Sequence, residues 1–152
     1  MKAYFPVTDR PEHTYIAGAS MGGYGALVHA MKDTEQYRAV GAFSPATVWA
    51  KDLEEKVGHK FPEPMDLYQI IRDDVDAGKK LPDIFFCVGN NDFLIESVDR
   101  FEEYLNELKI DHRFDRVDGY EHEWRFWELE LPEFLDWLPR TDSYAKMGKH
   151  KM

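Results

Sequence analysis

The stretch of sequence that decides the fold is TYIAGASMGGYGAL, from Thr14 to Leu27. It opens with a short apolar run that is typical of a β-strand, and it closes with residues that favour a helix. Between the two lies G-x-S-x-G, at Gly18 to Gly22, which in this context marks a nucleophile elbow. A serine on such a sharp turn holds its hydroxyl where a base can reach it. The stretch predicts Ser20 as a nucleophile, against the alternative of a glycine-rich turn with an incidental serine.

The residues next to Ser20 have predicted tasks of their own. Gly18 and Gly22 are expected to be glycines because a Cβ atom at either position would clash across the strand–helix junction. The backbone N–H of Met21 lies at the N-terminus of the expected helix, where the partial positive charge favours an anion. We therefore predict that the Met21 N–H donates to the oxyanion that forms when a carbonyl is attacked.

Two later loops supply candidate partners for the serine. After a nucleophile elbow of this kind, the partners follow in the order Asp or Glu and then His, each in a loop after a later strand. Asp92 follows the predicted strand Ile84–Gly89, and His122 follows the predicted strand Arg113–Val117. We predict that His122 is the general base and that Asp92 is the acid that orients it.

Other candidates for these two roles have weaker positions. Asp118 and Glu121 are so close to His122 in sequence that they are poorly placed to orient its ring from behind. Five other histidines lie elsewhere in the predicted fold. His13 lies before the elbow strand, His29 in a helix and His59 in a polar loop. His112 begins a strand, and His150 belongs to a basic tail. No spacing of His, Cys, Asp and Glu matches a zinc pattern, so neither a metal nor a cofactor is expected.

Three segments together resemble the esterase D branch of the α/β-hydrolases, and within it the tributyrin-esterase-like group. The segments are GASMGGYGA at Gly18–Ala26, GNNDFL at Gly89–Leu94 and GYEHEW at Gly119–Trp124. The resemblance implies a serine carboxylesterase that hydrolyses small acyl esters through an acyl-enzyme intermediate. It implies Ser20 as nucleophile, His122 as base and Asp92 as the orienting acid.

The resemblance extends over nearly the whole chain but over only the second half of the family's domain. Family members have several strands before the elbow strand, and a loop among them donates a second oxyanion N–H. We therefore expect a truncated α/β-hydrolase fold that lacks the N-terminal strands. Loss of one oxyanion donor typically costs about 100- to 1000-fold in rate. The alternatives are thus a catalytically impaired fragment, one half of a split hydrolase, or a thioesterase or peptidase of the same fold.

The rest of the sequence repeats a β-loop-α order, which predicts a three-layer α/β/α fold with a mainly parallel sheet. Strands are expected at His13–Gly18, Ala39–Phe43, Ile84–Gly89 and Arg113–Val117. Helices are expected at Gly22–Lys32 and Thr47–Val57, after the N-caps Asp66 and Ser97, and at Glu123–Leu138. Residues 1–140 are expected to form one domain, followed by a disordered basic tail at 141–152.

The last predicted helix carries a stripe of large apolar residues with helical spacing. The stripe consists of Trp124, Trp127, Leu131, Leu135 and Leu138. We expect it to pack into the core, with a kink at Pro132.

Composition narrows the class of protein. The 152 residues include 43% hydrophobic residues and carry a net charge of −10, which suits one folded domain. An acidic chain lacks the basic surface that nucleic acid or an anionic membrane requires. The single cysteine, Cys87, excludes an internal disulfide and is expected to be a buried hydrophobe. With no signal peptide or membrane-spanning run, a cytoplasmic location is expected.

The elbow strand has no chain-order neighbour on one side. An open strand edge exposes unpaired N–H and C=O groups and invites pairing with another strand. We therefore expect association through the edge near Tyr15 to Ala17, either with a second copy or with a partner chain. The other expected partner is a small ester substrate.

Overall fold

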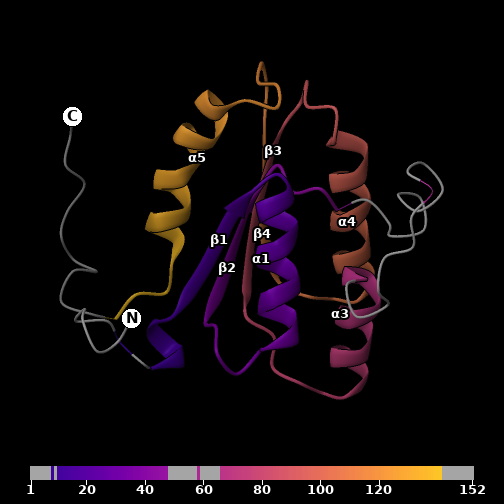
Figure 1. Cartoon of the computed structure of the whole chain (residues 1–152), viewed down its shortest axis with the longest axis vertical. Helices are drawn as coiled ribbons and strands as arrows, with labels where there is room; N and C mark the ends of the chain where they lie inside the picture. The colour runs from indigo at the N-terminus through magenta and orange to yellow at the C-terminus, as the bar shows by residue number, and fades with distance from the viewer. Residues whose placement is uncertain (1–7, 9, 48–57, 59–65, 142–152) are drawn as a thin grey trace.

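The computed structural model describes residues 8, 10–47, 58 and 66–141. Within them, four strands form one parallel sheet in the order β1-β2-β3-β4 (Figure 1). The strands are β1 (Tyr15–Ala19), β2 (Ala39–Phe43), β3 (Asp83–Gly89) and β4 (His112–Val117). Each lies within two residues of its predicted position, and the parallel pairing confirms the predicted sheet.

Helices cover both faces of this sheet and give the three layers that the sequence predicts (Figure 1). The helices are the short 3-10 helix η1 (Pro11–His13), α1 (Met21–Lys32), α3 (Leu67–Asp76), α4 (Ile95–Glu107) and α5 (Trp124–Trp137). The larger core cluster lies between the sheet and α1, α3 and α4, and the smaller one lies between the sheet and α5. The central strands β2 and β3 are therefore buried on both faces, as is typical of a parallel sheet, and the outer strands β1 and β4 are partly buried.

Strand β3 shows how one apolar run serves both cores. Residues 84–89 of β3 are all buried, and their side chains alternate between the two faces. Ile84, Phe86 and Val88 belong to the larger cluster, and Phe85 and Cys87 to the smaller one. The prediction that Cys87 is a buried hydrophobe is confirmed, and burial raises the pKa of its thiol far above the usual value.

The two predicted helix caps have different outcomes. The Asp66 carboxylate accepts hydrogen bonds from the backbone N–H groups of Tyr68 and Gln69, at 3.1 and 3.3 Å, and so caps α3 as predicted. Ser97 is not the cap of α4, because that helix begins two residues earlier with Leu94 at the N-cap. The Ser97 hydroxyl instead donates to the Leu94 carbonyl at 2.8 Å.

The prediction that the apolar stripe of α5 packs into the core is wrong for three of its five residues, whereas Trp127 and Leu138 are half-buried against the smaller core cluster. Trp124, Leu131 and Leu135 are 73%, 45% and 47% exposed, and the buried residues of α5 are Phe126, Glu130 and Phe134. The backbone of β2 gives the reason: a Cβ atom at Gly41 would stand 2.6 Å from the Phe134 ring. The missing side chain lets α5 approach the sheet at Phe134, which leaves Leu131 and Leu135 facing outward.

Some predictions fall outside the described residues. They concern the predicted helix Thr47–Val57 beyond Thr47, the polar loop that holds His59, and the predicted tail at 141–152 beyond residue 141; the domain boundary near residue 140 stays a prediction. Within the part of the chain that the structure describes, no helix is both long enough and apolar enough to cross a membrane.

Candidate active site

Ser20 occupies the turn between β1 and α1 in a conformation that few residues adopt. Its φ of 56° and ψ of −121° place a non-glycine residue at positive φ, which strains the backbone. Three hydrogen bonds hold this turn: the Ser20 N–H donates to the Phe43 carbonyl at 2.8 Å, and the Ser20 carbonyl accepts from Tyr24 and Ala46 at 3.2 Å. The serine is therefore fixed at the carboxyl ends of the strands.

Only some of the elbow glycines occupy positions that leave no room for a side chain. A Cβ atom at Gly18 would lie 2.2 Å from the Gly22 carbonyl oxygen, so the prediction for Gly18 holds. At Gly22 a Cβ atom would meet nothing within 4 Å, so the predicted clash at that position is wrong. The second tight position is Gly23, whose Cβ atom would lie 3.0 Å from the Gly18 carbonyl oxygen.

The structure brings the three predicted site residues together although they lie 102 positions apart in sequence at most. His122 Nδ1 lies 2.9 Å from Asp92 Oδ2, and His122 Nε2 lies 2.9 Å from Ser20 Oγ. A carboxylate only accepts hydrogen bonds, so Nδ1 carries the proton and Nε2 is left to accept from the serine hydroxyl. This arrangement can withdraw a proton from Ser20.

Asp92 has the burial and the contacts of an orienting group. It is 1% exposed, and while Oδ2 faces His122, Oδ1 accepts from the Leu94 N–H at 2.9 Å. The same turn leads into α4 from Leu94, which explains why Ser97 does not cap that helix. The carboxylate thus has two hydrogen-bond donors and one fixed orientation.

Met21 is the first residue of α1, and its side chain is 80% exposed. The first N–H groups of a helix have no acceptor within that helix. The role of this N–H as an oxyanion donor stays a prediction.

Two backbone hydrogen bonds hold the loop of Asp92 against the end of β4 and the loop of His122. The Asn91 N–H donates to the Tyr120 carbonyl at 3.0 Å, and the Asn90 N–H donates to the Val117 carbonyl at 2.9 Å. Gly89 lies beneath Tyr120, so closely that a side chain would collide with its backbone. A glycine at the end of a buried strand, just before the loop of Asp92, was the signal in the sequence for this contact.

Aromatic side chains surround the imidazole of His122. The Phe93 ring lies 4.8 Å from it and the Trp127 ring lies 5.1 Å from it, between ring centroids. Trp124 packs edge-on against Trp127 at 4.9 Å. Phe93 is 76% exposed, so this aromatic group extends from His122 to the surface of the described residues.

A cluster of charged groups lies under α5. Arg113 on β4 donates to Asp115 at 2.5 and 3.0 Å and to Glu133 at 3.1 Å. Glu130 is buried beside them, and its Oε2 atom has no hydrogen-bond partner among the described residues. Burial, helped by the charges of Asp115 and Glu133, raises the pKa of Glu130 to about 7.

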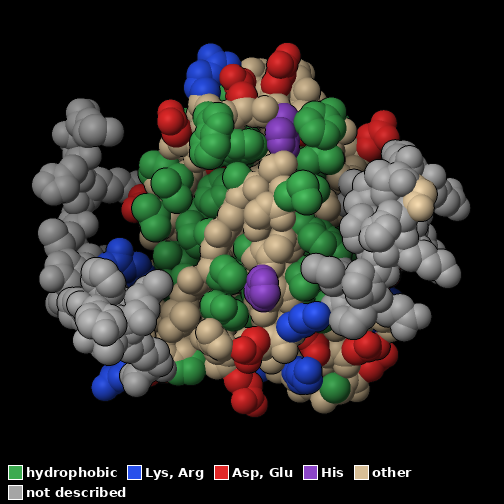
Figure 2. Space-filling model, in the orientation of Figure 1, with side chains coloured by type: hydrophobic (Ala, Val, Ile, Leu, Met, Phe, Trp, Pro, Cys, Tyr) green, Lys and Arg blue, Asp and Glu red, His purple; other side chains and the backbone are tan. Residues whose placement is uncertain are grey.

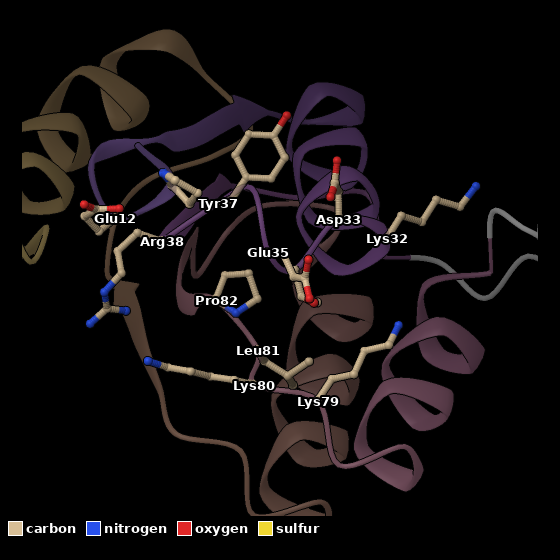
Figure 3. Close-up of a pocket in the computed structure, with 12 residues that line it drawn as sticks. Glu12, Lys32, Asp33, Glu35, Tyr37, Arg38, Lys79, Lys80, Leu81 and Pro82 are labelled. Atoms are coloured by element: carbon tan, nitrogen blue, oxygen red, sulfur yellow. The ribbon is translucent and has the colours of Figure 1, made fainter. Parts of the chain in front are cut away.

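A groove of about 690 Å³ lies at the other end of the sheet (Figure 3). It is lined by residues that precede β1, β2 and β3, and so it is remote from Ser20. Arg38 and Lys79, which line it, form ion pairs with Asp83 at 2.7 Å and Asp74 at 2.6 Å. Among the described residues, no three His, Cys, Asp or Glu side chains form a group that could hold a metal ion.

The parallel sheet, with helices on both faces and a serine turn at its carboxyl ends, is the α/β-hydrolase fold. Solved structures with this architecture include the S-formylglutathione hydrolase FrmB of Staphylococcus aureus, with a TM-score of 0.76 and 22% identity over 90% of this chain and 55% of that one. Another is the fluorophosphonate-binding serine hydrolase FphF of Staphylococcus aureus, with a TM-score of 0.78 and 21% identity over 90% of this chain and 58% of that one.

The sequence places the chain in a family. The family model described as "Putative esterase" matches residues 1–138, and the chain belongs to this Esterase family. An acetyl esterase of Caldicellulosiruptor saccharolyticus is 25% identical over 161 residues, which are 93% of this chain and 60% of that protein. The chain thus spans little more than half the length of the relatives it matches.

Proposed function

We propose that this chain carries the catalytic residues of a serine carboxylesterase that hydrolyses small acyl esters. The observation that carries the proposal is the pair of 2.9 Å contacts that join Asp92 to His122 and His122 to Ser20. Membership of the Esterase family and the strained turn at Ser20 support it.

In the proposed mechanism, Ser20 Oγ attacks the ester carbonyl while His122 Nε2 takes the hydroxyl proton. Asp92 holds the imidazole and stabilises its positive charge. The Met21 N–H donates to the oxyanion, and His122 then gives the proton to the leaving alcohol oxygen. Water, deprotonated by His122, releases the acyl group and restores Ser20 with its proton.

The preference for small acyl esters rests on the site and on the relatives. Met21, which follows Ser20 in the chain, and Phe93, which packs on His122, are exposed and offer short apolar surfaces at the proposed site. The acetyl esterase is named for a two-carbon acyl group, and FrmB for a formyl group. We extend this preference to the present chain.

The alternative is that the site needs a second polypeptide segment to work at full rate. Among the described residues β1 pairs with β2 alone and forms an edge of the sheet. Hydrophobic side chains gather along the side of the molecule where α5 lies (Figure 2). We infer that association through this edge, with a second copy or a partner chain, covers them and supplies a second oxyanion donor.

The experiment that tests the proposed function is hydrolysis of p-nitrophenyl acetate by the purified chain and by its Ser20→Ala variant. We expect turnover by the chain that falls to background in the variant. Equal rates in the two proteins would contradict an active esterase. If both rates are at background, addition of a polypeptide with the relatives' N-terminal strands distinguishes a split enzyme from an inactive one.

A further inference from the structure

A hydrogen bond joins the loop after β2 to α5 beside the base. The indole Nε1–H of Trp127 donates to the hydroxyl of Ser44 at 3.1 Å. Ser44 is fully buried, and its own N–H donates to the Cys87 carbonyl at 2.8 Å. The acceptor is therefore anchored to the sheet and cannot follow a movement of the indole.

Ser44, like Ser20, is a non-glycine residue at positive φ. Its φ is 43°, in the left-handed region that glycine adopts without cost. Compared with glycine, a serine at this position has a strained backbone, but its hydroxyl accepts the hydrogen bond from the Trp127 indole. The side chain thus has a contact that a glycine could not provide.

Trp127, held by its hydrogen bond to Ser44, packs directly on the imidazole of His122. The two rings pack edge to face, with centroids 5.1 Å apart and planes at 88°. Phe93 packs on the imidazole as well, at 4.8 Å, but its ring is 76% exposed and lies in a loop. Trp127 is the better anchored of the two rings because its indole is tied to a buried group.

Hydrogen bonds alone leave the imidazole some freedom. His122 makes one hydrogen bond through Nδ1 to Asp92 and one through Nε2 with Ser20, and a hydrogen bond tolerates a deviation of many degrees from its best angle. A ring that packs edge to face restricts rotation about the bond that carries the imidazole. Small misplacements of catalytic groups cost large factors in rate.

We propose that Ser44 and Trp127 are positioning residues that hold the His122 imidazole in line with Ser20. The proposal rests on the proposed function. According to this proposal, the Ser44–Trp127 hydrogen bond increases the rate of the chemical step and does not contribute to substrate binding. Neither side chain needs to touch the substrate.

Two variants remove the hydrogen bond with little other change. Trp127→Phe keeps an aromatic ring and loses the N–H, and Ser44→Gly loses the hydroxyl while its backbone adopts φ 43° without strain. Trp137→Phe is the matched control, because Trp137 lies on α5 and packs on Phe85 at 5.6 Å, in the core cluster under that helix.

We expect each of the two variants to lower kcat by about 10- to 100-fold with little change in KM. The double variant should be no slower than the slower single variant, because both changes remove one interaction. Trp137→Phe should keep the kcat of the wild type. A kcat near the wild-type value in folded Trp127→Phe, or losses that multiply in the double variant, would overturn the proposal.

A second measurement separates this proposal from the proposed function. The Nδ1 proton of His122 is followed by NMR in the purified chain with 15N-labelled histidine, which needs no turnover. We expect a slowly exchanging, far-downfield resonance in the wild type that broadens in Trp127→Phe and in Ser44→Gly. Equally sharp resonances in all three proteins would overturn the positioning role even where esterase activity is absent.

Discussion

Gly89 and Tyr120 lie in contact across the loops of the proposed acid and base: a Cβ atom at Gly89 would stand 2.3 Å from the Tyr120 carbonyl oxygen. Gly89 ends β3 three residues before Asp92, and Tyr120 precedes His122 by two. The separation of the acid from the base is therefore set by a backbone contact that only a glycine permits.

Gly89→Ala should move the two loops apart. Overpacking of this kind typically costs about 1 to 3 kcal/mol of stability, and the longer Asp92–His122 distance should lower kcat by at least about 10-fold. Thermal unfolding and ester hydrolysis measure the two effects. Gly25→Ala on α1 is the control, because a Cβ atom there meets nothing within 4 Å and should stabilise the helix by about 0.5 to 1 kcal/mol. Wild-type kcat in Gly89→Ala would show that the contact does not set the site.

Asp92→Asn tests the acid. An asparagine of the same size can present its amide to His122 and favour the wrong tautomer, which in serine triads costs about 10,000-fold in kcat. Single-turnover kinetics with p-nitrophenyl acetate measures the loss. Asp118→Asn, which changes a nearby carboxylate outside the proposed triad, should keep the wild-type rate. Full activity in Asp92→Asn would refute the assignment.

The fold and the meeting of Ser20, Asp92 and His122 could be predicted because their signals are local. The elbow motif fixes Ser20, and Asp92 and His122 each follow a strand that is visible as an apolar or alternating run. The contact that we propose to position His122 joins residues that are distant in sequence. Ser44 and Trp127 are 83 residues apart, and neither has a motif that names the other.

The error on α5 has the same physical origin. The helix carries two apolar series with helical spacing, and either series could face the sheet. What decides between them is the absence of a side chain at Gly41, on a strand more than 80 residues earlier. Periodicity within one helix cannot report such a partner.

The buried Glu130 predicts a dependence of stability on pH. Its pKa rises from an ordinary value of 4.5 to about 7, so between these pH values the folded protein binds more protons there than the unfolded chain does. The free energy of unfolding should therefore fall as the pH rises from 4.5 to about 7, by about 1 to 3 kcal/mol at this site. Denaturant unfolding at pH 5 and pH 8 measures the change.

Glu130→Gln should remove most of this fall, because its amide carries no charge at either pH. Glu128→Gln, at an exposed position of the same helix, should keep the wild-type pH dependence. A Glu130→Gln protein whose unfolding free energy falls as steeply as that of the wild type would contradict the account of the buried carboxyl.

The exposed stripe of α5 predicts self-association or partner binding. Leu131 and Leu135 are nearly half exposed, so lysines should be tolerated there without loss of the fold. Light scattering at micromolar concentration should show an assembly for the chain and a smaller species for the double variant L131K/L135K. If the unsubstituted chain is monomeric, its association with a second copy of itself is contradicted.

The most direct test of the central claim is covalent labelling of the chain with a fluorophosphonate, followed by mass spectrometry of the labelled peptide. Such reagents react with a serine whose hydroxyl is activated, and they require no complete catalytic cycle. The account predicts a label on Ser20 that disappears in Ser20→Ala and is strongly reduced in His122→Ala. Labelling of another residue, or an equal yield on Ser20 with and without His122, would contradict it.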